Sequence, residues 1–546
     1  MIKLKRSITL KHIRNIALVF FMMTAILGMV SCKEDDGSGH IFKINIENNP
    51  QNLDAQMATD SESIMIITNM MEGLMKKQAS GAIVPAAAEN IEMSEDGMTY
   101  TFYLKQNQQW ESMAEINEEV TADDFVFAFQ RIFDKETKSP YSSDYLCIKN
   151  ASAILNGFMD VNELGVKAVD KYTVEFTLEY PYYDFLNLLT KSAAMPCNRN
   201  FFEFTKGKYG MSADATASNG AFYLKEWNYD PYWDNNYIIM RRNKSYSDKQ
   251  YVYPYSLNFF ITGDKSADSL NFADGDIDCY VTDEYNEKLF SKSNYNAYQT
   301  KTVGLLFNTD SEYLNNYKVR EALSKSINRN AYSHELSENI STAYGIIPGA
   351  ITLQGKYYRD LLPDELLSVY DVNSPDLWQN VLNEIGKNSI DNLKITVSDE
   401  FAESKIIYNI SDQWRENLLL SCAVEVVSET EYEAKISDNS FSMALVELNA
   451  DENSLLEFCD YFTVGEYSEI YRITSLNSKV RSAESSTSLS EAVEKYSNVE
   501  KEILNQYIFV PLFYKNEYFV TSASAEDILF YPFISSADFS GAKYFE

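Results

Sequence analysis

The spacing of apolar residues changes between residues 94 and 133, and this change limits the folds open to the chain. After the turn "SEDG", the segment "MTYTFYL" alternates apolar with polar residues, which predicts a half-buried strand. From Thr121 the apolar residues recur every three or four positions in "TADDFVFAFQRIFD", and Thr121 with Asp124 forms a capping box that predicts a helix start. Strand and helix patterns therefore follow one another closely.

The same mixture continues along the chain without a repeat period. We expect strands in "HIFKINIENNP" and "KYTVEFTLEYP", a helix over "YKVREALSKSINRNAY", and a helix followed by a strand from "DQWRENLLLS" to "AVEVVS". At 546 residues the chain has enough length for two to four domains. The fold class is therefore α/β or α+β with several lobes.

The first 31 residues have the pattern of a removable leader. Residues 1–15 carry five Lys or Arg and no acid, and the apolar run Ile16–Val30 is interrupted only by Thr24. A run of this length falls short of the ~20 residues that cross a bilayer. Ser31 followed by Cys32 resembles the lipobox of bacterial lipoproteins, although Met29 stands where leucine is commonest. We expect lipid on Cys32 and a solvated tether over residues 32–39; the alternative is an ordinary signal peptide with an incidental cysteine.

Charge excludes two classes of partner. Without residues 1–31, the chain keeps 42 Lys and Arg against 80 Asp and Glu, a net charge of −38. Nucleic acid and anionic membrane surfaces would be repelled, so we expect no nucleic-acid partner and membrane contact through the lipid alone.

The sequence does not indicate an enzyme. It contains no G-x-S-x-G and no P-loop motif, and His334 is the one histidine in the part expected to fold. "DGDIDC", from Asp274, starts like a calcium loop, but Cys279 and Tyr285 stand where glycine and glutamate are needed. We therefore expect no catalytic residues, no metal and no cofactor. Cysteines 147, 197, 279, 422 and 459 show no CxxC spacing and are predicted to be small buried residues, with one disulfide left open.

An ordered series of motifs resembles one family, the extracytoplasmic solute-binding proteins of peptide-type ABC importers, and in particular their oligopeptide-binding members. The series covers essentially the whole chain after the leader. It runs, in the family's order, through "NPQNLD", "EGLMKKQASGAIVPAAAENIEMSEDGMTYTFYLKQNQQW", "VTADDFVFAFQRIFDKETKSPYSS", "LGVKAVDKYTVEFTLEYPYYDF", "SNGAFYLKEW", "FADGDID", "LLFNTDSEYLNNYKVREALSKSINRNAY", "AYGIIPGAI" and "YIFVPLFYKNEYFV".

The resemblance implies an α/β, two-lobed clam fold of the periplasmic-binding-protein type (cluster C), with an extra subdomain on the first lobe. The first lobe would comprise residues 40–72, 198–300 and 512–546, with the subdomain at 73–197. The second lobe would span 301–511. The chain would cross between the lobes twice, and the lobes would close on a ligand between them.

The resemblance also implies ligand-binding residues. The loop after the first strand aligns with Thr59, Asp60 and Ser61, and the tyrosine of "SPY" is Tyr141. A pocket aromatic of the second lobe aligns with Tyr432. The second ligand-facing strand aligns with Ala444, Leu445, Val446, Glu447 and Leu448. Backbone pairing on both sides would hold a peptide without reading its side chains.

The chain departs from the family where an aspartate usually pairs with the peptide's amino group. Leu445 and Leu448 stand where the family's tryptophan and aspartate are expected. Either Glu447, Asp451 or Asp60 replaces that aspartate, or the ligand has no free amine there, and a shift of one residue in the alignment would bring Glu447 to its place. With no replacement, the cleft should not distinguish free from acetylated peptides.

These features predict a monomeric, lipid-anchored carrier that captures oligopeptides outside the membrane and delivers them to ABC permease subunits. A carrier of another small solute on the same fold is one alternative. A surface adhesin or chaperone-like protein that kept the fold is another.

Overall fold

The structure is a computed structural model that describes residues 38–545 except 79–80, 115, 117, 233–234, 334–339, 363–373 and 402–403. The unit described below is His40–Glu546. Cys32 and His334 lie outside the described residues.

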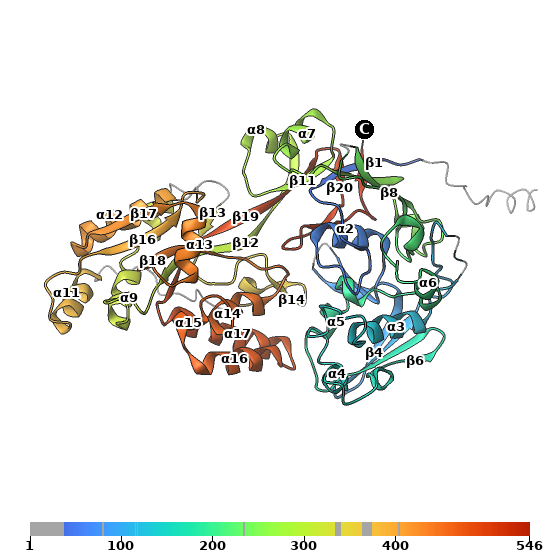
Figure 1. The fold of residues 1–546 in the computed structure, drawn as a ribbon, viewed down its shortest axis with the longest axis horizontal. Coiled ribbons are helices and arrows are strands. Elements are labelled where there is room, and N and C mark those ends of the chain that lie inside the picture. Colours follow the sequence, from blue (N-terminus) through green and yellow to red (C-terminus); the bar gives the residue numbers. More distant parts are fainter. Residues whose placement is uncertain are drawn as a thin grey trace, which may run out of the picture. The chain divides into compact units, whose positions relative to one another are not determined.

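One mixed sheet organises the described residues (Figure 1). Its 11 strands include the path β17-β16-β18-β12-β19-β11-β1-β10-β9-β8, with β13 paired beside β19. The strands are β1 (Ile41–Ile46), β8 (Phe222–Asn228), β9 (Asn236–Arg242), β10 (Ser256–Ile261), β11 (Cys279–Thr282), β12 (Ser293–Phe307), β13 (Ile340–Thr342), β16 (Leu393–Ser398), β17 (Cys422–Val427), β18 (Met443–Leu448) and β19 (Phe509–Ser522). Strand β1 has the predicted alternation and pairs in parallel with β10 and β11.

Strands β12 and β19 are the longest of the sheet, with 15 and 14 residues, and they pair antiparallel. Figure 1 shows them running side by side between the two halves of the sheet. The register shifts between Gln299 and Lys301 and again between Val303 and Gly304. The two positions where we expect the chain to pass between lobes, 300/301 and 511/512, lie within β12 and β19, which are hydrogen-bonded to each other.

Helices cover both faces of the sheet around β18. On one face helices α9 (Tyr317–Lys325), α11 (Ser374–Glu384) and α12 (Ser404–Leu418) pack on Val303, Leu305 and Leu445. On the other face helices α14 (Leu455–Thr463), α15 (Ser468–Tyr471), α16 (Thr474–Glu484) and α17 (Leu489–Leu504) pack on Ala444 and Val446 and on Leu306 of the neighbouring strand β12. Because β18 is buried on both sides, its sequence "MALVEL" is almost continuously apolar.

A separate four-stranded antiparallel sheet, β4-β5-β7-β6, lies within the residues expected to form the subdomain. The strands are β4 (Ala88–Met93), β5 (Thr99–Leu104), β6 (Val166–Asp170) and β7 (Thr173–Thr177). Helix α3 (Ala122–Phe133) packs against β6 and β7. The strand predicted in "MTYTFYL" and the capping box of Thr121 and Asp124 are both confirmed.

The remaining elements are short strand pairs and helices. The strands are β2 (Met75–Lys77), β3 (Ile83–Pro85), β14 (Thr352–Leu353), β15 (Lys356–Tyr357), β20 (Ala525–Glu526), β21 (Leu529–Tyr531), β22 (Ser536–Asp538) and β23 (Lys543–Tyr544). The helices are α2 (Ser61–Met70), α4 (Ala151–Leu155), α5 (Phe185–Leu188), α6 (Arg199–Phe204), α7 (Asp268–Asp274), α8 (Glu287–Phe290), α9 (Tyr317–Lys325), α10 (Arg329–Tyr332), α11 (Ser374–Glu384), α12 (Ser404–Leu418), α13 (Glu429–Ser437), α14 (Leu455–Thr463), α15 (Ser468–Tyr471), α16 (Thr474–Glu484) and α17 (Leu489–Leu504).

One predicted helix is wrong in its extent. The segment "YKVREALSKSINRNAY" forms two helices, α9 and α10, instead of one. The break occurs because Asn328 leaves the helical conformation and caps α10, accepting a hydrogen bond from the Asn330 N–H at 3.1 Å. The Asn328 N–H in turn donates to the Gln413 side chain of α12 at 2.7 Å.

The described cysteines form no disulfide, and the acidic segment "DGDIDC" is a helix end followed by a strand. The five described cysteines are free and buried, as predicted. In "DGDIDC", Asp274 ends α7, Gly275 adopts a left-handed C-cap, and Cys279 begins β11. Within the described ranges, no group of three or more His, Cys, Asp or Glu could hold a metal ion. Nor does any helix among these residues have the length and apolar character to cross a membrane.

Candidate functional site

The loop Thr59–Ser61 leads into helix α2, and Asp60 caps that helix. Asp60 Oδ1 accepts a hydrogen bond from the Ser63 N–H at 2.9 Å. Its second oxygen, Oδ2, is buried and has no hydrogen-bond partner in the described residues. Thr59 is exposed and Ser61 is half-buried. The loop therefore has one exposed residue, Thr59, next to a buried carboxylate oxygen of Asp60 that has no hydrogen-bond partner in the described residues.

Tyr141 lies against this loop. Its hydroxyl donates a hydrogen bond to the backbone oxygen of Ala58, the residue before Thr59. Burial raises the pKa of the Tyr141 phenol, which therefore stays neutral and able to donate. The structure thus brings together two of the segments that sequence analysis assigned to the ligand, although they lie about eighty residues apart.

Most side chains of strand β18 are buried, so the strand has mainly backbone groups with which to contact a ligand. Ala444, Leu445, Val446 and Leu448 are 0 to 1% exposed, and successive side chains enter the cores on opposite faces of the sheet. Leu448 therefore cannot reach a ligand with its side chain. Glu447 is the one partly exposed residue of the five predicted here.

One edge of β18 is open near its carboxyl end. The strand pairs with β12 along its whole length but with β16 only at Met443 and Ala444. At the next residue, the Tyr432 hydroxyl donates a 2.6 Å hydrogen bond to the Leu445 oxygen. Backbone groups two residues apart point to the same side of a strand, so the N–H and C=O of Glu447 face this edge, where no described strand pairs with them. Tyr432 caps the edge from α13, and burial raises the pKa of its phenol.

Glu447 is already neutralised by two lysines. Its carboxylate lies 3.2 Å from Lys301 Nζ and 3.2 Å from Lys515 Nζ. A ligand ammonium would have to compete with both, so Glu447 is a poor replacement for the family's aspartate.

Asp451, in the loop after β18, has a different environment. It is exposed, and no described residue forms a hydrogen bond or ion pair with its carboxylate. Its backbone N–H donates to Glu457 Oε2 at 2.6 Å. Burial raises the pKa of Glu457 to about 7, against the effect of that hydrogen bond and assisted by the charges of Glu452 and Asp451.

Lys191 joins the two groups of predicted residues. Its ammonium lies 3.1 Å from Asp144 and 2.7 Å from Glu452, the residue after Asp451. Asp144 lies in the same turn as Tyr141, and its N–H donates to the Tyr141 oxygen at 3.1 Å. Lys191 and Glu452 were missed by sequence analysis because they lie 261 positions apart and belong to no short motif.

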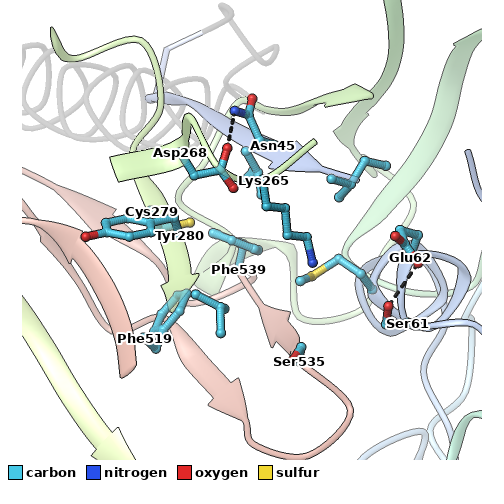
Figure 2. A pocket seen from close by; sticks show the side chains of 14 residues that line it. Asn45, Ser61, Glu62, Lys265, Asp268, Cys279, Tyr280, Phe519, Ser535 and Phe539 are labelled. Carbon is cyan, nitrogen blue, oxygen red and sulfur yellow. Dashed lines mark hydrogen bonds between the residues drawn. The ribbon is translucent and has the colours of Figure 1, made fainter. Parts of the chain in front are cut away.

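Ser61 also lines a small cavity, together with residues of β1, β11 and β19 (Figure 2). It has a volume of about 50 Å³. Ser61 donates to Glu62 at 2.9 Å on one wall, and Asn45 donates to Asp268 at 2.7 Å on another. Figure 2 shows the Lys265 side chain extending between these walls. A larger hollow of about 380 Å³ is lined by Lys394, Glu425 and other polar residues, and none of the predicted site residues lines it.

Comparison with known proteins decides the family. The family model for bacterial extracellular solute-binding proteins, family 5 Middle, matches residues 82–468, more than half of the chain. The chain belongs to this family. The family consists of solute-binding proteins, so its members bind and do not catalyse. The dipeptide-binding protein DppE of Bacillus subtilis is 27% identical over 384 residues, which cover 69% of this chain and 68% of that protein.

Two further similarities extend over more of the chain. The periplasmic murein peptide-binding protein MppA of Escherichia coli is 25% identical over 483 residues, 86% of each protein. The solved structure of MppA in its unliganded open form covers 93% of this chain and 99% of that chain, with a TM-score of 0.71 and 23% identity. The fold is therefore the two-lobed α/β fold of this family, as the motif series predicted.

Proposed function

We propose that the protein is a carrier that binds peptides by their backbone and delivers them to an ABC importer. The open edge of β18 at Glu447 carries this proposal, because an extended peptide can add to it as a further strand. The loop Thr59–Ser61, in which Thr59 is exposed and which follows the Ala58 oxygen bound by Tyr141, would meet the peptide from the first lobe. The relatives named as peptide-binding proteins support the same ligand class.

Asp451 is the residue we propose for the peptide's amino group. An ammonium taken from water needs a charged partner, and an unpaired buried charge costs several kcal/mol. Glu447 is held by two lysines, and Asp60 uses one oxygen to cap α2. The Asp451 carboxylate forms no ion pair and caps no helix in the described residues, and Asp451 lies four residues after Glu447 at the open edge of β18.

The lipid on Cys32 would keep the carrier at the membrane beside its permease, as an extracytoplasmic monomer. The two lobes, at the boundaries given above, would close because a bound peptide gains contacts from both that neither lobe makes alone.

Calorimetry and small-angle scattering on the mature chain test this function. Trialanine should bind, and saturating peptide should reduce the radius of gyration. An unchanged scattering profile with binding established by calorimetry would remove closure from the mechanism. Failure to bind any of a set of di- to pentapeptides, with a non-peptide solute copurifying from the native host, would favour a carrier of another solute.

A further inference from the structure

A buried ion pair lies directly behind the loop that we assign to the ligand. The guanidinium of Arg131, in the last turn of α3, donates to both carboxylate oxygens of Asp54, and the Nη1–Oδ1 distance is 2.9 Å. Arg131 is 4% exposed and Asp54 7% exposed. Asp54 belongs to the first lobe's amino-terminal segment, whereas α3 belongs to the segment expected to form the subdomain.

The same arginine also fixes Gln56. Arg131 Nη1 donates to Gln56 Oε1 at 2.7 Å. The Gln56 amide donates in turn to the backbone oxygens of Ala193 at 3.1 Å and Met195 at 2.9 Å. Gln56 is fully buried, so each of its side-chain atoms has a partner inside the protein.

Backbone contacts extend this anchorage to the edge of the ligand loop. Ser139 donates to the Gln56 oxygen at 2.7 Å, and Tyr141 donates to the Ala58 oxygen. The N–H groups of Met57 and Ala58 both donate to the backbone oxygen of Asp54 at 2.8 Å. Thr59, the first exposed residue, follows immediately.

We propose that Arg131 is a positioning residue for peptide binding, because it fixes Asp54 and Gln56 and thereby the backbone of Thr59–Ser61. This inference rests on the proposed function. A loop that is already held in its binding conformation loses little entropy when the peptide arrives, so the affinity should depend on this anchorage. The planar fork of arginine contacts Asp54 and Gln56 at once, which a lysine ammonium at the same place cannot reproduce in full.

A set of variants separates positioning from a merely structural role. Arg131→Met leaves the Asp54 carboxylate buried and unpaired, so it should lower both stability and affinity. The double variant Asp54→Asn/Arg131→Met removes both charges and should recover much of the urea midpoint. Arg131→Lys should lie between the wild type and Arg131→Met in affinity.

Arg199→Met is the matched control. Arg199 stacks on Phe127 at 4.0 Å and donates to Gln130 at 3.1 Å, both on α3. In the described part of the chain it forms no hydrogen bond or ion pair with residues 54–61. Its affinity for peptide should equal that of the wild type.

The measurements are trialanine affinity under conditions where circular dichroism shows each variant folded, the urea midpoint, and amide exchange over residues 57–61. Positioning predicts that the double variant stays weaker in affinity by on the order of tenfold or more and exchanges faster in this loop, although its midpoint recovers. Affinity that recovers together with the midpoint would overturn the inference. A wild-type protein that binds no peptide would instead overturn the proposed function, and the inference with it.

Discussion

The carboxylate of Glu447 and the ammonium of Lys515 lie 3.2 Å apart, although β12 separates their strands in the sheet. Lys301 of β12 lies equally close to the same carboxylate. Glu447 thus balances two lysines that would otherwise repel each other. Its carboxylate therefore joins β18 to the paired strands β12 and β19, and it is not free to bind a ligand's amine.

A double-mutant cycle should detect this pair. Glu447→Gln and Lys515→Met should each destabilise the protein, and their coupling in urea unfolding should be about 0.5 to 1 kcal/mol, as for a partly exposed ion pair. Additive effects within error would show that the contact contributes nothing.

The close approach of Gly210 to Asp54 gives a second prediction. Gly210 has a φ of +73°, and a Cβ there would lie 2.4 Å from the Asp54 nitrogen. Gly207 has a φ of +84° with nothing within 4 Å of its Cβ position. Gly207→Ala should cost about 1 kcal/mol through the left-handed backbone alone. Gly210→Ala should cost a further 1 to 3 kcal/mol or so, because the backbone of Asp54 must move. Equal losses for the two variants, measured by urea unfolding, would contradict the crowding at Asp54.

Local pattern predicted the elements of this fold well where one period dominates. The alternation in "MTYTFYL" and the capping box at Thr121 depend on neighbouring residues alone, and both occur as predicted. The break between α9 and α10 was not predicted, because it depends on a distant residue: the Asn328 N–H donates to Gln413, 85 positions away. Contacts of that range leave no mark on local periodicity.

The pKa of Glu457 gives a prediction for pH dependence. Its folded value of about 7 exceeds the usual 4.5, so the folded state binds more protons than the unfolded state between these values. The contribution of Glu457 to stability is therefore fully present below about pH 4.5 and is lost as the pH rises through 7. Other buried carboxyls add to the same trend, so the comparison must be with Glu457→Gln.

Urea unfolding of the wild type and of Glu457→Gln at several pH values between 5 and 8 measures this difference. The stability of the wild type should fall more steeply with pH than that of the variant. Parallel curves would contradict the raised pKa.

Acylation of Cys32 is the fourth prediction. Cys32 follows a small residue at the end of the apolar run and begins a polar segment, so Cys32→Ala should release the protein from the membrane fraction. Glu34→Ala, in the expected tether, should leave the protein membrane-bound. Retention of Cys32→Ala, with no lipid mass on the mature amino terminus of the wild type, would rule out the anchor.

The candidate site was only partly accessible from sequence. The motif series indicated the loop at Thr59 and Tyr141, and the structure places these together through Ala58. The motif series did not show that Leu448 faces the core, because a strand buried on both faces lacks the apolar–polar alternation that would assign its side chains to one face. Nor did it show that Glu447 is bound by Lys301 and Lys515, which lie far from it in sequence.

Calorimetry on one peptide in free and N-acetylated forms tests whether the peptide lies along β18 with its amino group on Asp451. Acetylation should weaken binding to the wild type by roughly ten- to a hundredfold, the value of a hydrogen bond to a charged group. Asp451→Asn should abolish that difference, and Glu447→Gln should preserve it. Equal affinity of the wild type for both forms, or a difference abolished by Glu447→Gln and not by Asp451→Asn, would show that Asp451 does not bind the amino group.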